Sequence, residues 1–371
     1  MLVGVPREIK DSEYRVGLVP STVHELTLKG HRVLVEKDAG VGAGLADDAY
    51  LAAGAQIAPN AERVFAEAEL IVKVKEPLAC ERKKLRPGQV LFTYLHLAPD
   101  RAQTEDLMAS GCIAIAYETV TGPQGGLPLL MPMSEVAGRM SSQAGAHCLE
   151  KVVGGRGVLL GGVPGVPAAD VLVLGGGIAG ANAARVAAGM GATVTVVDRN
   201  PDVLRRIDNT LTGLQTVFST RHAVETLCRR ADLVIATVLV PGATAPKLIT
   251  AETVRAMKPG AVIVDVSIDQ GGCAETSRPT THSHPTYIVD DVVHYCVANM
   301  PGAVARTSTF ALNNMTLPHV TALADKGYRV ALGQDPHLRA GLNVHEGRIT
   351  YKAVADALKL PYVPAEQVLR M

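Results

Sequence analysis

Short apolar runs rich in valine, isoleucine and leucine recur along the first third of the chain, and longer mixed stretches separate them. Their apolarity is continuous rather than alternating, which is typical of strands buried on both faces of a parallel sheet. We therefore expect five buried strands, at Leu2–Val5, Arg32–Glu36, Leu70–Lys75, Val90–Tyr94 and Ile113–Tyr117.

The stretches between these runs predict helices. We expect them at Thr22–Lys29, Ala61–Ala68 and Arg101–Ala109. Gly30 follows the first of them and Asp100 precedes the third, and these residue types commonly end and begin helices. Strands that alternate with helices favour βαβ units and a parallel sheet.

A second α/β series begins near Ala168. Its expected strands are Val171–Leu174, Thr193–Val197, Leu233–Thr237, Ala261–Val266 and Val292–Val297. A helical stretch, Ser134–Val152, lies between the two series, and Gly154–Pro167 is so rich in Gly and Pro that it predicts a loop. After Pro301 the pattern turns helical, with no further strong strand. Because such a tail is too short for a core of its own, we expect it to pack on the first domain or the hinge.

Composition and charge narrow the class of protein. The chain has 371 residues, 47% of them hydrophobic and 19% charged, which suits an ordered protein of two or three domains. Lys and Arg number 36, as do Asp and Glu, so net charge gives no reason to expect nucleic acid or an anionic membrane as partner. No apolar run is long enough to span a membrane.

Other features favour a cytoplasmic protein. The opening residues lead straight into a strand-like run, so we expect no signal peptide. The cysteines show no zinc-site spacing, and in a chain of this size they indicate reduced thiols. They are Cys80, Cys112, Cys148, Cys228, Cys273 and Cys296.

A glycine fingerprint follows the first strand of the second series. Gly175, Gly177 and Gly180 have the spacing Gly-x-Gly-x-x-Gly, a helix is expected at Ala181–Met190, and the next strand ends at Asp198. In dinucleotide-binding folds the first glycine permits a tight turn, the second lets the backbone approach the pyrophosphate, and the third lets helix and strand pack closely. An acidic residue at the position of Asp198 binds the ribose hydroxyls and disfavours a 2′-phosphate. The pattern therefore predicts NAD rather than NADP, although the neighbouring Arg199 softens that preference.

Polar residues follow several of the expected strands, where open parallel sheets bind ligands. Arg15, Lys75, His96 and Asp269 are the four that we single out. Taken singly, each has a plainer interpretation: a solvated cation, a structural histidine or a helix cap. Together they supply two cations, an acid–base group and a carboxylate, which suits a small carboxylate-bearing substrate beside a nicotinamide.

At these residues the chain resembles the alanine dehydrogenase family, which also includes the NAD-binding component of proton-translocating transhydrogenase. The resemblance covers essentially the whole chain. Its motifs are Gly4-Val5-Pro6-Arg7-Glu8, Arg15-Val16, Lys73-Val74-Lys75-Glu76-Pro77, Leu91-Phe92-Thr93-Tyr94-Leu95-His96-Leu97, Ile115-Ala116-Tyr117-Glu118-Thr119, Pro132-Met133-Ser134-Glu135, the glycine fingerprint, Val264-Asp265-Val266-Ser267-Ile268-Asp269-Gln270 and Val297-Ala298-Asn299-Met300-Pro301.

The resemblance implies roles for matching residues. Arg15 and Lys75 would bind the substrate, and His96 and Asp269 would be the catalytic pair. Beyond the fingerprint glycines, the NAD site would include Ser134, Ile178, Ala179, Asp198, Val238, Leu239, Asp269, Arg278, Val297, Ala298, Asn299 and Met300. Some relatives pair a His with the residue at Glu118 in a metal site. Lys326 takes the place of that His here, so we expect no metal.

The resemblance also implies the architecture. It is an α/β fold with a central Rossmann NAD-binding domain, residues 131–303, and a discontinuous α/β substrate domain with a parallel sheet, residues 1–130 and 304–371. Family members are commonly hexameric, so we expect a homo-oligomer. Since His96 and Asp269 fall in different domains, we expect catalysis to require domain closure.

The activity implied is NAD-dependent, reversible oxidative deamination of L-alanine to pyruvate and ammonium. Three alternatives remain: the NAD-binding component of transhydrogenase, a related dehydrogenase of another amino acid, and a non-catalytic NAD sensor. Transhydrogenase components carry Arg-Ala-Gln near Pro132–Glu135 and are normally tied to membrane domains. A sensor would not need four converging polar groups.

Overall fold

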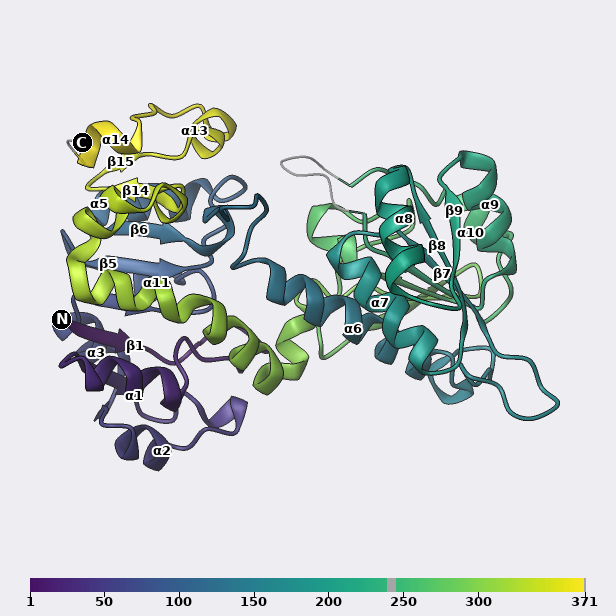
Figure 1. Ribbon diagram of the computed structural model, residues 1–371, viewed down its shortest axis with the longest axis horizontal. Coiled ribbons are helices and arrows are strands. Elements are labelled where there is room, and N and C mark those ends of the chain that lie inside the picture. The colour runs from purple at the N-terminus through teal and green to yellow at the C-terminus, as the bar shows by residue number, and fades with distance from the viewer. Residues whose placement is uncertain (239–244, 370–371) are drawn as a thin grey trace. The chain divides into compact units, whose positions relative to one another are not determined.

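The computed structural model describes residues 1–238 and 245–369. The chain forms two compact units, unit 1 comprising Met1–Met133 and Gly302–Met371, and unit 2 comprising Ser134–Pro301 (Figure 1). Each unit contains a predominantly parallel sheet with helices, so the predicted α/β class is confirmed. Unit 1 is built from both ends of the chain, so residues far apart in sequence pack together in it.

The sheet of unit 1 has eight strands in the order β15-β14-β6-β5-β4-β1-β2-β3. The first six strands along the chain pair in parallel; five of them were predicted, and β3 was not. Their bounds are β1 (Leu2–Val5), β2 (Arg32–Glu36), β3 (Gln56–Ala58), β4 (Leu70–Val72), β5 (Val90–Thr93) and β6 (Ile113–Ala116).

The end of the chain corrects one expectation, because it does contain strands. β14 (Leu342–His345) pairs antiparallel with β6, and β15 (Arg348–Ile349) pairs antiparallel with β14. The sheet is therefore mixed rather than wholly parallel. Apolar periodicity missed β14 because two of its four residues, Asn343 and His345, are polar although buried.

Helices cover both faces of this sheet. Residues such as Val33 and Val35 face α1 and α11, whereas Leu34 lies on the opposite face, with α3, α5 and α13. The alternation follows from the period of two along a strand. The helices of unit 1 are α1 (Pro20–Leu28), α2 (Asp47–Ala52), α3 (Ala61–Glu67), α4 (Ala79–Arg82), α5 (Arg101–Ser110), α11 (Ala305–Gln334), α12 (Pro336–Arg339), α13 (Lys352–Leu358) and α14 (Ala365–Leu369), with short 3-10 turns η1 (Val41–Ala43) and η2 (Tyr117–Thr119).

Helix starts in unit 1 follow local rules. The side chain of Asn60 accepts a hydrogen bond from the Arg63 N–H at 3.1 Å, at the start of α3. Asp100 caps α5 in the same way, through the Gln103 N–H at 2.9 Å, as the sequence predicted.

Unit 2 has a seven-stranded sheet in the order β12-β13-β11-β10-β7-β8-β9. Six strands run parallel and β12 pairs antiparallel with β13. Two of these strands, β9 and β12, were not predicted; both are partly exposed, unlike the fully buried β10, β11 and β13. The bounds are β7 (Asp170–Leu174), β8 (Thr193–Asp198), β9 (Gln215–Phe218), β10 (Leu233–Ala236), β11 (Val262–Asp265), β12 (Thr286–Val289) and β13 (Val292–Tyr295).

The helices of unit 2 pack on its sheet and enclose two apolar cores. They are α7 (Ile178–Gly189), α8 (Pro201–Thr210), α9 (Arg221–Arg230) and α10 (Ala251–Arg255), with 3-10 turns η3 (Lys151–Val153) and η4 (Val266–Gln270). The boundary between the units falls within α6 (Met131–Cys148), and the second crossing lies within η5 (Met300–Val304).

The structure also shows the state of the cysteines and whether any helix could span a membrane. All six cysteines are free, and only Cys80 is exposed. Burial raises the pKa of the thiols that lie inside, for example that of Cys112 to about 11. In the described part of the chain, no helix is both long and apolar enough to cross a membrane.

Candidate functional site

Arg15 lies in the loop after β1 and is held by a neighbouring carboxylate. Its side chain is only 2% exposed. Nε donates to Glu13 Oε1 and Nη2 donates to Glu13 Oε2, both at 2.6 Å, while Nη1 lies 3.1 Å from Met133 Sδ. Burial opposes the charge of Arg15, but the bonds to Glu13 outweigh it and raise the pKa of Arg15. The guanidinium is therefore a fixed, permanently charged group.

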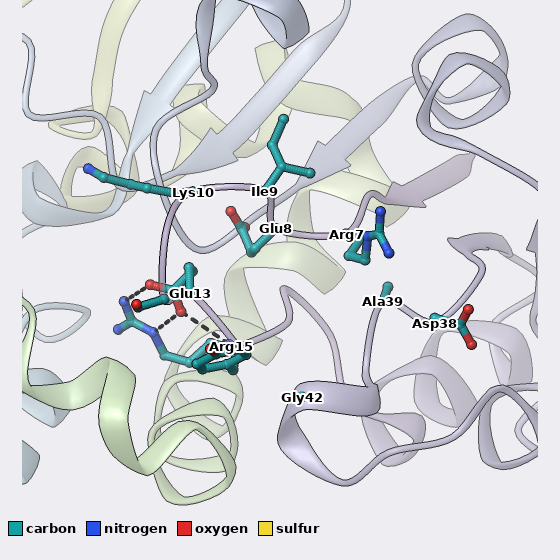
Figure 2. Close-up of a pocket in the computed structure, with 11 residues that line it drawn as sticks. Arg7, Glu8, Ile9, Lys10, Glu13, Arg15, Asp38, Ala39 and Gly42 are labelled. Carbon is teal, nitrogen blue, oxygen red and sulfur yellow. Dashed lines mark hydrogen bonds and ion pairs between the residues drawn. The ribbon is translucent and has the colours of Figure 1, made fainter. Parts of the chain in front are cut away.

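A cavity of about 440 Å³ opens within unit 1 beside this pair. Figure 2 shows the guanidinium of Arg15 turned toward Glu13 at one side of the cavity, with Arg7 and Asp38 at the other. Its walls carry charges of both signs. Among the four polar groups that the sequence singled out, Arg15 alone lines it.

Lys75 follows β4 and is half-buried. Its Nζ makes no hydrogen bond or ion pair with the residues that the structure describes. Burial, followed by the nearby Arg15 guanidinium, lowers the pKa of Lys75 below its ordinary value. A partly desolvated cation without a partner of its own is suited to bind an anionic or developing oxyanion oxygen.

His96 follows β5 and sits on a constrained backbone. Its φ is +50°, a left-handed conformation that is uncommon for residues other than glycine. Its exposed ring stacks on Tyr94, with centroids 5.9 Å apart and planes at 7°. Glu118 holds this turn: its carboxylate accepts the N–H of His96 at 2.7 Å and that of Leu95 at 3.2 Å.

Glu118 is thus committed to peptide groups in this structure. Lys326, which takes the place of a metal-binding His in some relatives, donates to Gln334 Oε1 at 2.8 Å. Among the described residues, no three His, Cys, Asp or Glu side chains are grouped as metal ligands would be.

Three of the singled-out groups share one neighbourhood of unit 1. Arg15 interacts electrostatically with both Lys75 and Tyr94, and Tyr94 stacks on His96. The fourth group, Asp269, lies in η4, directly after β11 of unit 2.

The glycine fingerprint of unit 2 forms the expected strand–turn–helix. β7 ends at Leu174, and Gly175 turns the chain with φ +94°. A Cβ on Gly180 would lie 1.7 Å from the Gly175 carbonyl oxygen, so only glycine fits there. Gly177 caps α7, and a Cβ on it would meet nothing within 4 Å, which leaves its surroundings open to a ligand.

Asp198 ends β8 next to this turn. Its Oδ2 accepts the Gly176 N–H at 2.7 Å and its Oδ1 accepts the Asn200 N–H at 2.8 Å. The Gly176 carbonyl in turn accepts a hydrogen bond from Arg206 Nη2 at 2.7 Å. A half-buried carboxylate thus stands at the glycine turn that follows β7.

Arg278 is positioned by an aromatic ring. Its guanidinium carbon lies 4.2 Å from the centroid of Tyr287, and the backbone N–H of Arg278 donates to the Tyr287 hydroxyl at 2.8 Å. Nearby, Asp265 at the end of β11 accepts hydrogen bonds from the Cys273 N–H at 2.7 Å and the Ser277 hydroxyl at 2.6 Å. These bonds close the loop that carries both Asp269 and Arg278.

The remaining predicted cofactor residues differ in exposure. Val297 and Met300 are buried in the core of unit 2. Leu239 lies outside the described residues. Ile178 and Ala298 are exposed, whereas Ser134, Ala179, Val238 and Asn299 are half-buried.

Sequence reasoning missed Glu13, Tyr287 and Asp265 as supports of the site. Glu13 stands only two residues before Arg15, which is a usable signal for a local ion pair. Tyr287 had no such signal, because its contact with Arg278 depends on how the loop folds back.

Comparisons with known proteins point to one family over nearly the whole chain. Residues 4–137 match the family model described as "Alanine dehydrogenase/PNT, N-terminal domain", and residues 141–352 match its C-terminal counterpart. The chain is 59% identical to an alanine dehydrogenase of Halomonas elongata, with 100% of both chains covered. A solved structure of an L-alanine dehydrogenase superposes with a TM-score of 0.94 at 51% identity, covering 97% of this chain and 99% of that one.

A solved transhydrogenase structure from Sinorhizobium meliloti is more distant. It superposes with a TM-score of 0.81 at 24% identity, covering 95% of this chain and 100% of that one. At that identity it supports the fold alone.

Proposed function

The chain belongs to the alanine dehydrogenase/PNT family, and we propose that it oxidises L-alanine to pyruvate and ammonium, reversibly, with NAD as hydride acceptor. One observation carries the substrate assignment: Arg15, Lys75 and His96, drawn from three separate loops, share one neighbourhood of unit 1. A fixed guanidinium, a partnerless ammonium and an exposed imidazole suit a small amino or keto acid.

The residues of unit 2 fit a dinucleotide. The turn at Gly175–Gly177 leaves open space at the start of α7, where backbone N–H groups and the helix dipole favour phosphates. The Asp198 carboxylate stands at the end of the next strand, which supports NAD over a cofactor with a 2′-phosphate. NAD, when bound, supplies the hydride-accepting ring.

The residues of this chain would divide the remaining work. Arg15 would hold the substrate carboxylate, and Lys75 Nζ would stabilise the oxygen as the carbonyl forms. Alanine loses its Cα hydride to give an imine, water adds, and the resulting carbinolamine expels ammonia. His96 would exchange the proton on the carbinolamine oxygen. Asp269 would stabilise the cationic amine or imine and orient the water.

Two alternatives are less well supported. The transhydrogenase relative is only 24% identical, against 59% for the Halomonas enzyme. A non-catalytic NAD sensor would not need the cluster around Arg15. A dehydrogenase of another amino acid differs only in side-chain tolerance and remains an outcome of the test below.

The proposal extends to the protein's state in the cell. We propose a cytoplasmic homo-oligomer, a hexamer as is common in the family, acting on small molecules and not on nucleic acid or membranes. Light scattering coupled to gel filtration would test the oligomeric state.

The direct test is to measure NADH formation with a panel of amino acids, alongside NADPH formation from NADP. We expect L-alanine and NAD to give the highest kcat/KM. Turnover of another amino acid in preference to alanine would reassign the substrate, and no turnover with any of them would favour the sensor.

A further inference from the structure

Three charged side chains are buried together behind the turn that carries Lys75. Lys73 is 0% exposed, Glu81 2% and Glu8 7%. Lys73 Nζ donates to Glu81 Oε1 at 2.7 Å and to Glu8 Oε2 at 3.1 Å. Each carboxylate thus uses one oxygen for the same ammonium group.

The second oxygen of each carboxylate binds the peptide backbone. Glu8 Oε1 accepts the N–H of Val74 at 2.7 Å and the N–H of Lys75 at 3.3 Å. Glu81 Oε2 instead accepts the N–H of Leu78 at 2.8 Å. The two glutamates therefore share one cation, but only Glu8 touches the residue that we assign to substrate binding.

The burial of these three charges is by itself weak evidence that the trio stabilises the fold. Buried ion pairs are often replaced by apolar residues of similar volume without loss of stability, because desolvation offsets their attraction. The Nζ of Lys75 also has no partner among the described residues. The hydrogen bonds that hold Lys75 are therefore those of its backbone: its N–H donates to Glu8 Oε1 at 3.3 Å, and its carbonyl accepts from the Thr93 hydroxyl at 2.9 Å.

We propose that Glu8 is a positioning residue for Lys75: its carboxylate, oriented by Lys73, fixes the peptide of Lys75 so that the ammonium group lies beside Arg15. The inference rests on the proposed function, in which Lys75 holds the oxygen of pyruvate. It gives the buried trio a role in substrate binding and not in NAD binding.

The test compares Glu8→Gln with Glu81→Gln. An amide offers one acceptor where a carboxylate offers two, so Gln at position 8 satisfies Lys73 or the peptide N–H groups, but not both. Glu81→Gln is the matched control, since it weakens the same cation's bonding but leaves the Lys75 peptide alone. Both variants are assayed as full-length enzyme for pyruvate KM, oxamate inhibition, kcat and NADH affinity.

We expect Glu8→Gln to raise the pyruvate KM and the oxamate inhibition constant by about tenfold, the scale of one charge-assisted hydrogen bond. NADH affinity should stay within about twofold, and Glu81→Gln should change oxamate inhibition by less than about threefold. Equal effects of the two variants, or unchanged oxamate inhibition in Glu8→Gln, would overturn the proposal. If Glu8→Gln is insoluble, Glu8→Asp keeps both acceptors but shortens their reach, and the same comparison applies.

The variant Lys75→Met distinguishes failure of the positioning role of Glu8 from failure of the proposed substrate-binding role of Lys75. Weak oxamate inhibition in Lys75→Met with normal inhibition in Glu8→Gln would refute only the positioning role. Normal oxamate inhibition in Lys75→Met would refute the assignment of Lys75, and the positioning role with it.

Discussion

Asp198 Oδ2 accepts the N–H of Gly176 over 2.7 Å, so the end of β8 is bonded directly to the glycine turn after β7. The carboxylate that we expect to bind the ribose therefore also shapes the turn that we expect to bind the phosphates. This double use of one side chain determines how its removal should affect cofactor choice.

Asp198→Ala should weaken NAD binding and reduce the discrimination against NADP, because it removes both the ribose acceptor and the negative charge. Fluorescence titration with NADH and NADPH measures both effects. Asp202→Ala, at an exposed site on α8, is the control for charge alone. An unchanged ratio of the two affinities in Asp198→Ala would contradict the assignment.

Arg15→Met should strongly weaken pyruvate binding by removing the partner of the carboxylate. It should also destabilise the fold by about 3–5 kcal/mol, because it leaves Glu13 buried without its cation. Adding Glu13→Gln should recover part of the lost melting temperature but none of the pyruvate affinity. Recovery of both would mean that Arg15 is only structural.

The affinity for oxamate, an analogue of pyruvate, should fall with rising pH as Lys75 loses its proton. Since burial and Arg15 lower the pKa of Lys75, this loss should begin below its ordinary value of 10.5. The free energy of unfolding should change in the opposite direction. Because the unfolded chain keeps the Lys75 proton to higher pH than the folded protein, the protein should become more stable as pH rises from the lowered pKa of Lys75 toward 10.5. Lys75→Arg should move the fall in affinity to higher pH, and an unmoved fall would exclude Lys75 as its source.

His96→Asn should cut alanine turnover by about 100-fold or more while NAD still binds. Asn is the better replacement than Ala because it tolerates the left-handed conformation at φ +50°. Asp269→Ala should lower turnover to a similar extent. Turnover and melting temperature are measured on the same preparations, and a well-folded His96→Asn enzyme with near-normal turnover would refute the proton-transfer role.

Deletion of Val304–Met371 should give insoluble protein. It removes α11 from one face of the unit 1 sheet and leaves the edge of β6 without β14. Val19 would also lose its acceptor, since Asn313 Oδ1 accepts its N–H at 2.9 Å. A soluble, active truncated enzyme would contradict this account of the segment.

Local pattern was sufficient for the elements whose signals are contained in a few consecutive residues. β1 and β2 begin and end at the predicted residues, and each contains a short apolar run buried on both faces. The strand–turn–helix at the glycine fingerprint was also predictable from local sequence, since only glycine allows residue 180 to lie so close to the Gly175 carbonyl. Arg15, Lys75 and His96 were predicted as site residues because parallel strands bring their ends to one edge.

What required the folded chain was the pairing of residues distant in sequence. β14 alternates apolar and polar residues and gives no strong strand signal, and it forms because β6, more than two hundred residues earlier, offers an unpaired edge. The bond from Glu8 to the Lys75 peptide is likewise invisible in sequence, because it forms only once β1 and β4 lie side by side. Hydrophobic periodicity encodes which residues are buried, but a buried polar group is matched to its partner only by the packing that brings the two together.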